Sequence, residues 1–279
     1  MTKSRGTGKV MTTFNRWQNV IVAVLLCVTI ADGADLRSAV QNPISSLVSL
    51  PFQFNFDNGA ENGDANILNI QPVYPITHGN WNYVSRLIVP IVDAPGGTPG
   101  LPSIPNSQLG ERTQGLGDIN YSLFLSPAKV GTFTWGVGPS VSLPTASDKA
   151  LGSGKWSVGP TFVILGQPSW GTAGALFRQI WSFAGDTDRP DLSQFLFEPF
   201  LNYNLRDGWF LISDMVWTSN WHADSGNQWT IPIGGGIGRV FKIADQPINS
   251  RLEGYKNAFK PDGASDWTVR FTFQFLFPK

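Results

Sequence analysis

The chain has 279 residues with 20 basic and 20 acidic side chains, a balance that argues against a basic surface for nucleic acid. Its one cysteine, Cys27, lies in the first 33 residues, so the rest of the chain offers no disulfide and no thiol nucleophile or ligand. The remaining classes are exported or membrane proteins that fold without disulfides.

The N-terminus carries the pattern of an export signal. Four basic residues precede an apolar run of 11 residues at 20–30, and small residues follow it. At about 1.5 Å per residue this run is too short to cross a hydrocarbon layer of about 30 Å. Residues 1–33 are therefore predicted to be a cleaved signal peptide, with cleavage after Ala31 or Gly33. Residues 34–46 are predicted to be a short periplasmic segment.

Segments in which apolar and polar side chains alternate fill the rest of the chain. Most of them are about 10 to 13 residues long, which suits tilted membrane strands of about 9–11 residues. They are predicted at 47–56, 65–76, 81–92, 115–126, 132–143, 155–166, 171–183, 192–205, 209–221, 229–241, 250–259 and 267–277. Residues 47–279 are thus predicted to form an all-β, 12-stranded antiparallel up-and-down transmembrane β-barrel.

The connections alternate in length, as the turns and loops of such barrels do. Connections after even-numbered segments are short, whereas those after odd-numbered segments are mostly longer and richer in Asp. The pattern predicts periplasmic turns and outer loops. The longest connection, 93–114, either folds into the barrel as a constriction or stays outside as a disordered Pro/Gly loop. Tryptophans are expected at both membrane interfaces: Trp156, Trp181, Trp221, Trp229 and Trp267 at outer strand ends, and Trp81, Trp170 and Trp209 at inner ends.

The last segment, WTVRFTFQFLF, shows the two faces most clearly. One face is predicted to meet lipid and the other to line the lumen. The lipid-facing residues are Val269, Phe271, Phe273, Phe275 and Phe277, and the lumen-facing residues are Thr268, Arg270, Thr272 and Gln274. Five prolines inside predicted strands remove ladder donors and predict bulges or misplaced strand boundaries there: Pro72, Pro139, Pro160, Pro199 and Pro232.

Charged residues inside the strands are expected to face the lumen, because an arginine facing lipid at mid-depth would cost about 2–4 kcal/mol. These candidates for a functional site are Arg86, Asp118, Arg178, Glu198, Asp214, Arg251, Glu253 and Arg270. Their signs are mixed. They either pair and plug the barrel or line a path for a solute.

Residues that could carry catalysis are few. The two histidines, His78 and His222, are expected at opposite ends of the barrel. His222, Asp224 and Ser225 are neighbours in sequence and raise the alternative of a lipid-acting hydrolase, but a polar outer loop is the simpler interpretation. The GGGIG run at 234–238 is followed by a strand pattern, so it predicts a kinked or closely packed strand instead of a nucleotide loop. We predict no enzyme activity, cofactor or metal.

The chain also resembles a known family. The pieces that carry the resemblance cover most of 41–279 and include QNPISSLVSLPFQFNF, NILNIQPVYPI, GLGDINYSLFLSP, WGVGPSVSLPTASD, EPFLNYNL, GNQWTIPIGGGIGRVF and PDGASDWTVRFTFQFLFPK. They are similar to bacterial outer-membrane proteins labelled neuromedin-U-like transporters, which are related to the phenol-degradation meta-pathway barrel proteins. The resemblance implies an outer-membrane barrel with a transport role and names no substrate.

Together these patterns predict a passive transport protein or channel in the outer membrane of a Gram-negative bacterium. Its solute is expected to be small and apolar or aromatic, by family analogy. The alternatives are an outer-membrane lipid-acting hydrolase and a closed structural or adhesion barrel. The expected partners are outer-membrane lipid and lipopolysaccharide, the barrel assembly machinery and the small-molecule solute, with no nucleic acid.

Overall fold

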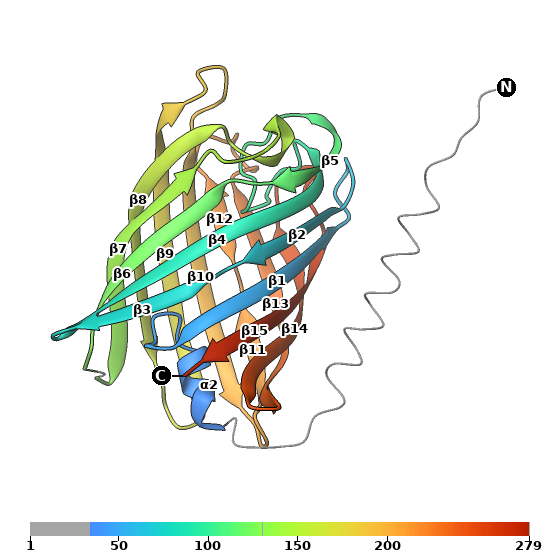
Figure 1. Cartoon of the computed structure of the whole chain (residues 1–279). Coiled ribbons are helices and arrows are strands. Elements are labelled where there is room, and N and C mark those ends of the chain that lie inside the picture. Colours follow the sequence, from blue (N-terminus) through green and yellow to red (C-terminus); the bar gives the residue numbers. More distant parts are fainter. Residues whose placement is uncertain (1–33, 130, 279) are drawn as a thin grey trace.

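The computed structural model describes residues 34–129 and 131–278, so the predicted signal peptide, 1–33, lies outside the described residues. The strands form one antiparallel sheet in which the first and last strands pair, and this pairing closes the sheet into a barrel (Figure 1). Three positions in the wall are each occupied by two successive short strands, β2 with β3, β5 with β6 and β11 with β12. The wall is therefore twelve-stranded, and the predicted fold class is confirmed.

The elements follow the predicted order closely. They are α2 (Ala34–Val40), β1 (Val48–Asn58), β2 (Ala65–Ile70), β3 (Val73–His78), β4 (Trp81–Gly96), β5 (Gly110–Leu116), β6 (Ile119–Pro127), β7 (Phe133–Leu143), η1 (Lys149–Leu151), β8 (Lys155–Gly166), β9 (Gly171–Gly185), β10 (Ser193–Asn204), β11 (Trp209–Asp214), β12 (Trp217–Asn220), β13 (Trp229–Ile243), β14 (Gln246–Phe259) and β15 (Trp267–Phe277). In the described part of the chain, no helix has the length and apolar character needed to cross a membrane.

One strand begins earlier than predicted. The pattern places the eleventh strand at 250–259, whereas β14 begins at Gln246. The chain reverses between Ile243 and Gln246, which pair with each other, in a tight turn where Ala244 has a φ of 52°. Asp245 and Pro247 resemble loop residues, but the turn needs only two residues, so the ladder includes Pro247.

The prolines inside strands have three different outcomes. Pro72 separates β2 from β3, and a register shift lies between Ile231 and Pro232, so the predicted irregularities are confirmed there. Pro139 and Pro160 face each other within the paired strands β7 and β8 without a register shift, so the irregularity predicted at these two positions is wrong. Pro199 stays within β10. The irregularity falls on the strand position paired with it, in the gap between β11 and β12.

The seam between β1 and β15 joins the two ends of the sheet along its whole length, from Val48 opposite Phe277 to Asn58 opposite Trp267. On the outer face, the Phe54 and Phe271 rings lie 6.2 Å apart. On the inner face, Asn55 lies opposite Arg270, which is buried, as are Thr272 and Gln274. The two predicted faces of the last segment are therefore confirmed.

The outer surface of the wall is apolar, and its large side chains remain exposed, as a lipid-facing wall requires. Tryptophans lie near both ends of the strands. Trp81 packs against Trp135 at the end of the barrel that holds α2, with ring centroids 6.3 Å apart. Trp221 and Trp229 pack at the opposite end, 5.5 Å apart. We call these ends the plug end and the cap end.

Candidate functional site in the barrel lumen

The lumen holds a cavity of about 260 Å³ that reaches from one end segment to the other. At the plug end it is lined by Gln41 and Asn42, and at the cap end by Leu101 and Pro102. Seven of the eight predicted lumen residues lie on its wall: Arg86, Asp118, Arg178, Glu198, Asp214, Arg251 and Arg270. The eighth, Glu253, is buried and contacts two of these arginines.

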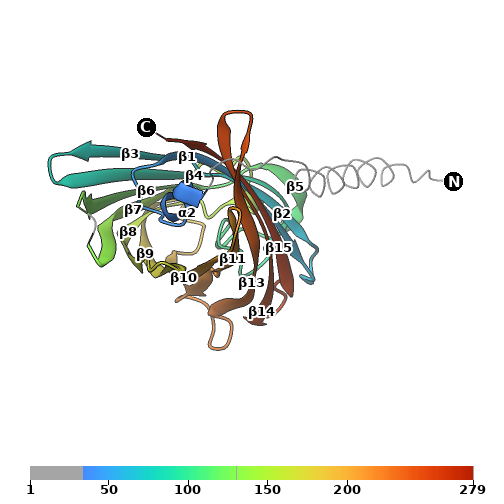
Figure 2. The ribbon, with the colours of Figure 1, turned by 90° about the horizontal axis from the view of Figure 1, so that it is seen from below.

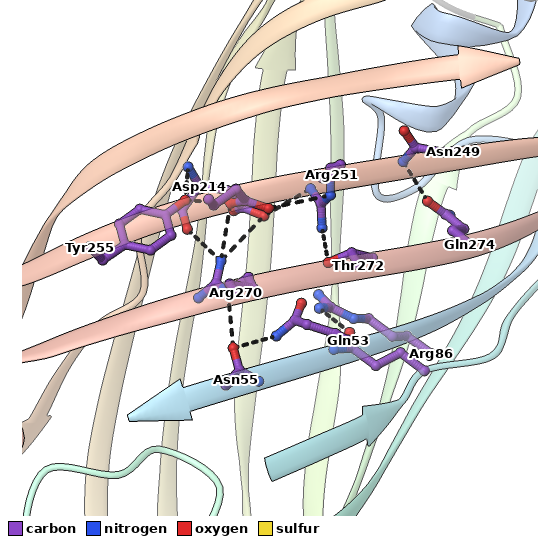
Figure 3. Close-up of polar contacts among 12 residues, drawn as sticks. Gln53, Asn55, Arg86, Asp214, Asn249, Arg251, Tyr255, Arg270, Thr272 and Gln274 are labelled. Atoms are coloured by element: carbon purple, nitrogen blue, oxygen red, sulfur yellow. Dashed lines mark hydrogen bonds and ion pairs between the residues drawn. The ribbon is translucent and has the colours of Figure 1, made fainter. Parts of the chain in front are cut away.

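A cluster of ion pairs and hydrogen bonds in the lumen joins five residues from β11, β14 and β15, and we call it the Asp214–Arg270 cluster (Figure 3). Its members are Asp214, Arg251, Glu253, Tyr255 and Arg270. Arg251 contacts Asp214 at 3.3 Å and Glu253 at 3.5 Å. Arg270 lies 3.6 Å from Glu253, and its guanidinium stacks 4.9 Å from the centre of the Tyr255 ring. The Tyr255 hydroxyl donates to Glu253.

Strand register explains why this cluster forms. Glu253 of β14 lies directly opposite Arg270 of β15, and both side chains point inward. Opposite charges at paired positions stabilise a sheet, and inside a barrel their only alternative partners are other lumen groups. The cluster therefore braces the wall next to the seam.

A further lumen carboxylate, Glu198, lies on the strand next to Asp214. Glu198 belongs to β10, and the register places Asp214 of β11 opposite Phe200, two residues further along β10. Both acids line the cavity, so the cluster continues onto a fourth strand.

Two other arginines have uncharged partners. Arg178 of β9 donates to Asn120 Oδ1 at 2.9 Å and to Gln194 Oε1 at 3.1 Å. Arg86 of β4 donates to Gln71 Oε1 at 3.0 Å. Among the described residues, neither guanidinium has a carboxylate within 4.0 Å. The lumen thus has a braced side and a side with two unpaired positive charges.

Residues 34–46, which we call the plug, fold into the mouth of the barrel (Figure 2). Arg37 donates to the carbonyls of Leu205 and Trp209 at 2.5 and 3.2 Å. Gln41 donates to Asn204 at 2.9 Å and accepts from Thr172 at 2.9 Å. The segment predicted to be a short periplasmic extension therefore folds into the barrel and closes much of the plug end.

The plug also packs against the apolar interior of the barrel. Ile44 is 1% exposed and belongs to a cluster with Val84, Phe124 and Val163, residues of three different strands. Leu36, Ala39 and Val40 pack against a second buried cluster, which includes Phe210 and Leu276. Burial of an isoleucine side chain contributes about 1.5–3 kcal/mol, enough to hold a short segment in place. The plug is thus anchored by polar contacts at one point and by apolar packing at another.

The long connection after β4 folds inward at the cap end, so the first of its two predicted alternatives is observed. Two of its apolar side chains, Leu101 and Ile104, are buried against Ile67, Val92 and Leu151. We call the loops at 97–109, 144–154 and 186–192 the cap. Asp118 belongs to the cap as well as to the lumen, since its carboxylate accepts from Ser153 N and Oγ, both at 2.7 Å.

Arg189 joins the three cap loops. Its guanidinium is buried and donates to the carbonyls of Asn106 at 2.8 Å, Lys149 at 3.1 Å and Gly152 at 2.5 Å. These three carbonyls come from the two other cap loops. One side chain therefore holds the cap together.

Replacement of Arg189 by alanine should loosen the cap. Each hydrogen bond from a charged group contributes about 1.5–3 kcal/mol, and the variant leaves three carbonyls without this donor. We expect faster proteinase K cleavage within 97–109 in the folded, lipid-embedded protein. The matched control is Asp188→Ala, an exposed neighbour in the same loop. Equal cleavage rates in the two variants would contradict the role given to Arg189.

A second contact in the cap makes the stability of the fold depend on pH. The buried Lys155 donates to Asp191 Oδ1 at 3.1 Å, and Ser182 donates to the same atom at 3.2 Å. Mainly because of Lys155, the pKa of Asp191 lies below its ordinary value of 3.8. A carboxyl whose pKa is lowered on folding stabilises the fold above its unfolded pKa, and this contribution is lost as the pH falls through the folded value.

The stabilities of wild type and Asp191→Asn should therefore differ by a constant amount between about pH 5 and 8 and converge below about pH 4. The variant leaves the Lys155 ammonium buried without its carboxylate, so it is expected to be the less stable protein over the upper range. Thermal unfolding in detergent, followed by tryptophan fluorescence, measures the stability of wild type and variant at each pH. A difference that grows as the pH falls would contradict this assignment.

The residues considered for catalysis lie apart. His78 ends β3 at the plug end, whereas His222 is in the connection between β12 and β13 at the cap end. His222 and Ser225 are exposed, and in the described residues no hydrogen bond joins their side chains. The GGGIG run lies inside β13, where a Cβ at Gly238 would overlap the Phe210 ring. The predicted closely packed strand is confirmed.

Several lumen residues are absent from the predicted functional site, whose candidates are all charged. The same period of two places uncharged amides on the cavity wall, among them Asn55, Asn69, Asn202 and Asn249. Arg37 and Gln41 of the plug and Arg189 of the cap had no comparable signal, because they lie outside the strand pattern.

The closed wall, the apolar exterior and the charged, plugged lumen define an outer-membrane β-barrel. The chain belongs to the family described as "Putative MetA-pathway of phenol degradation", whose model matches residues 42–246. The relationship to phenol-degradation barrels that the sequence suggested is thereby confirmed, whereas the neuromedin-U-like label finds no support. No curated protein sequence matches the chain.

Solved structures with similar folds include an outer membrane channel from Pseudomonas putida F1. It matches with a TM-score of 0.57 and 15% identity over 83% of this chain and 94% of that chain. The outer membrane phospholipase A from Escherichia coli matches with a TM-score of 0.43 and 13% identity, over 88% of this chain and 98% of that chain. At these identities the likeness shows the fold alone, and it agrees with the predicted location in the outer membrane.

Proposed function

We propose that the protein is a passive outer-membrane channel for a small apolar or aromatic solute. The observation that carries this proposal is the lumen, in which polar and charged side chains line a continuous cavity between plug and cap. A barrel that served only as a wall would need no such cavity. The similar structure from Pseudomonas putida F1, described as a channel, supports the same conclusion.

The nature of the solute follows from the family and from the apolar part of the cavity wall. The family description refers to phenol degradation, which supports an aromatic solute. Among the residues that line the cavity, Leu196, Phe200 and Val216 offer apolar contacts for such a ring. The seven predicted charged residues that line the cavity are proposed to orient the solute and to exclude others.

Uptake into liposomes tests the proposal directly. Reconstituted wild-type protein should admit phenol faster than empty liposomes do, and should show single-channel conductance in planar bilayers. A folded barrel that gives neither uptake nor conductance would refute the channel.

The alternative of a closed structural barrel is favoured by one observation, the closure of both ends by plug and cap. It predicts a sealed lumen under every condition, including after the plug is removed. The lipid-acting hydrolase receives no such support, because His222 and Ser225 have no contact that would make a catalytic pair in the described residues.

A further inference from the structure

The charge on one side of the lumen is not balanced by neighbouring carboxylates. Arg251 and Arg270 form ion pairs within the Asp214–Arg270 cluster at 3.3 to 3.9 Å. Arg86 and Arg178 have only amide partners, and among the described residues no carboxylate lies within 4.0 Å of either guanidinium.

The acids of the cluster are engaged by its own arginines. Asp214 and Glu253 each lie within ion-pair distance of Arg251 and Arg270. Asp118, the other acid on this side, is turned to the cap, where Ser153 and Ala146 donate to it. A positive charge therefore remains around Arg86 and Arg178.

Arg178 also has unused donor capacity. It is 8% exposed, and its Nε is buried without a hydrogen-bond partner. A buried charged group without full hydrogen bonding is costly, so a ligand that brings an opposite charge and further acceptor atoms would be bound favourably. A guanidinium binds a carboxylate through two parallel hydrogen bonds, which neutral amides cannot reproduce.

Apolar side chains lie next to each of these arginines. Strand register places Leu196 opposite Arg178 and Val73 opposite Arg86, and all four residues line the cavity. Both apolar side chains belong to or pack against the cluster that includes Phe200. The site thus combines two guanidinium groups with an apolar wall.

We propose that this part of the lumen binds a small organic anion with an apolar body, of which an aromatic carboxylate is the simplest example. Arg178 and Arg86 bind the carboxylate, and the side chains of Leu196 and Phe200 contact the ring. This inference rests on the proposed channel function and deepens it, since it makes an anionic solute the preferred one.

Calorimetric titration of the purified full-length protein in detergent tests the site without any need for conduction. Benzoate is the probe, and benzamide and acetate are its neutral and small counterparts. We expect benzoate to bind more tightly than either, and Arg178→Gln to weaken benzoate binding about tenfold or more. Arg239→Gln, an outward-facing arginine that stacks on Trp209, is the matched control and should bind as wild type does.

Arg86→Gln provides a second variant in case Arg178→Gln does not fold, which heat-modifiable gel migration reveals. Equal binding of benzoate and benzamide would overturn the proposal, as would equal binding of benzoate and acetate. If benzoate binds as expected but no conductance is found, the channel fails and the site stands. If the protein conducts but benzoate does not bind, the site fails and the channel stands.

Discussion

Deletion of residues 35–45 should raise the single-channel conductance of the barrel several-fold. The plug occupies the barrel mouth through Arg37, Gln41 and Ile44, and the lumen cavity begins directly behind it. Its removal leaves the plug end open while β1 keeps its full pairing with β15. Planar bilayer recordings of wild type and variant in the same lipid measure the change.

The plug and the cap lie in series along the lumen, so the deletion should act more strongly when the cap is also loosened by Arg189→Ala. A Gly/Ser segment of equal length in place of 35–45 serves as the matched control, because it keeps the chain length but removes the contacts. It should conduct as the deletion does. Unchanged conductance in a correctly folded deletion variant would favour the closed structural barrel.

Replacement of Arg270 by alanine should destabilise the barrel by about 3–5 kcal/mol, the usual cost of removing one partner from a buried ion pair. Arg270 contacts Glu253, whose side chain is fully buried, and it also donates to Asn55 and to the carbonyl of Asp214. Urea unfolding in lipid vesicles, followed by tryptophan fluorescence, gives the free energy of unfolding of each variant.

A double variant separates two causes of the stability lost in Arg270→Ala: the carboxylate left without a partner and the lost packing of the side chain. Arg270→Ala combined with Glu253→Gln removes the unpaired carboxylate and should recover part of the lost stability. Arg206→Ala, an exposed residue in a plug-end turn, is the control and should change stability by less than about 0.5 kcal/mol. If the double variant is less stable than Arg270→Ala, the burial of an unpaired charge does not explain the loss.

The wall could be predicted from the sequence because lipid imposes a strict rule on it. Residues such as Phe273 and Gln274 alternate between hydrocarbon and lumen, and a period of two records this in the chain. The same rule placed Arg178 and Glu253 inside, since a charge facing lipid is costly. These predictions needed no knowledge of which residues pair.

The segments that close the barrel could not be predicted in this way. Arg37 bonds to backbone carbonyls about 170 positions away, at Leu205 and Trp209. Arg189 likewise bonds to the carbonyls of Asn106 and Gly152. Every residue has a backbone carbonyl, so these contacts do not require a particular residue type at the partner position and cannot be recognised in the sequence. Whether the barrel is open or closed is therefore decided by contacts that the sequence pattern does not record.

The seam has a consequence for incomplete chains. A chain that stops before Trp267 leaves the edges of β1 and β14 without their partner. Within hydrocarbon, each unsatisfied backbone group costs several kcal/mol, so a sheet with two open edges is not a stable spanning structure. Truncated products should thus fail to insert and remain substrates for periplasmic proteases. Only chains that include β15 would then accumulate in the membrane.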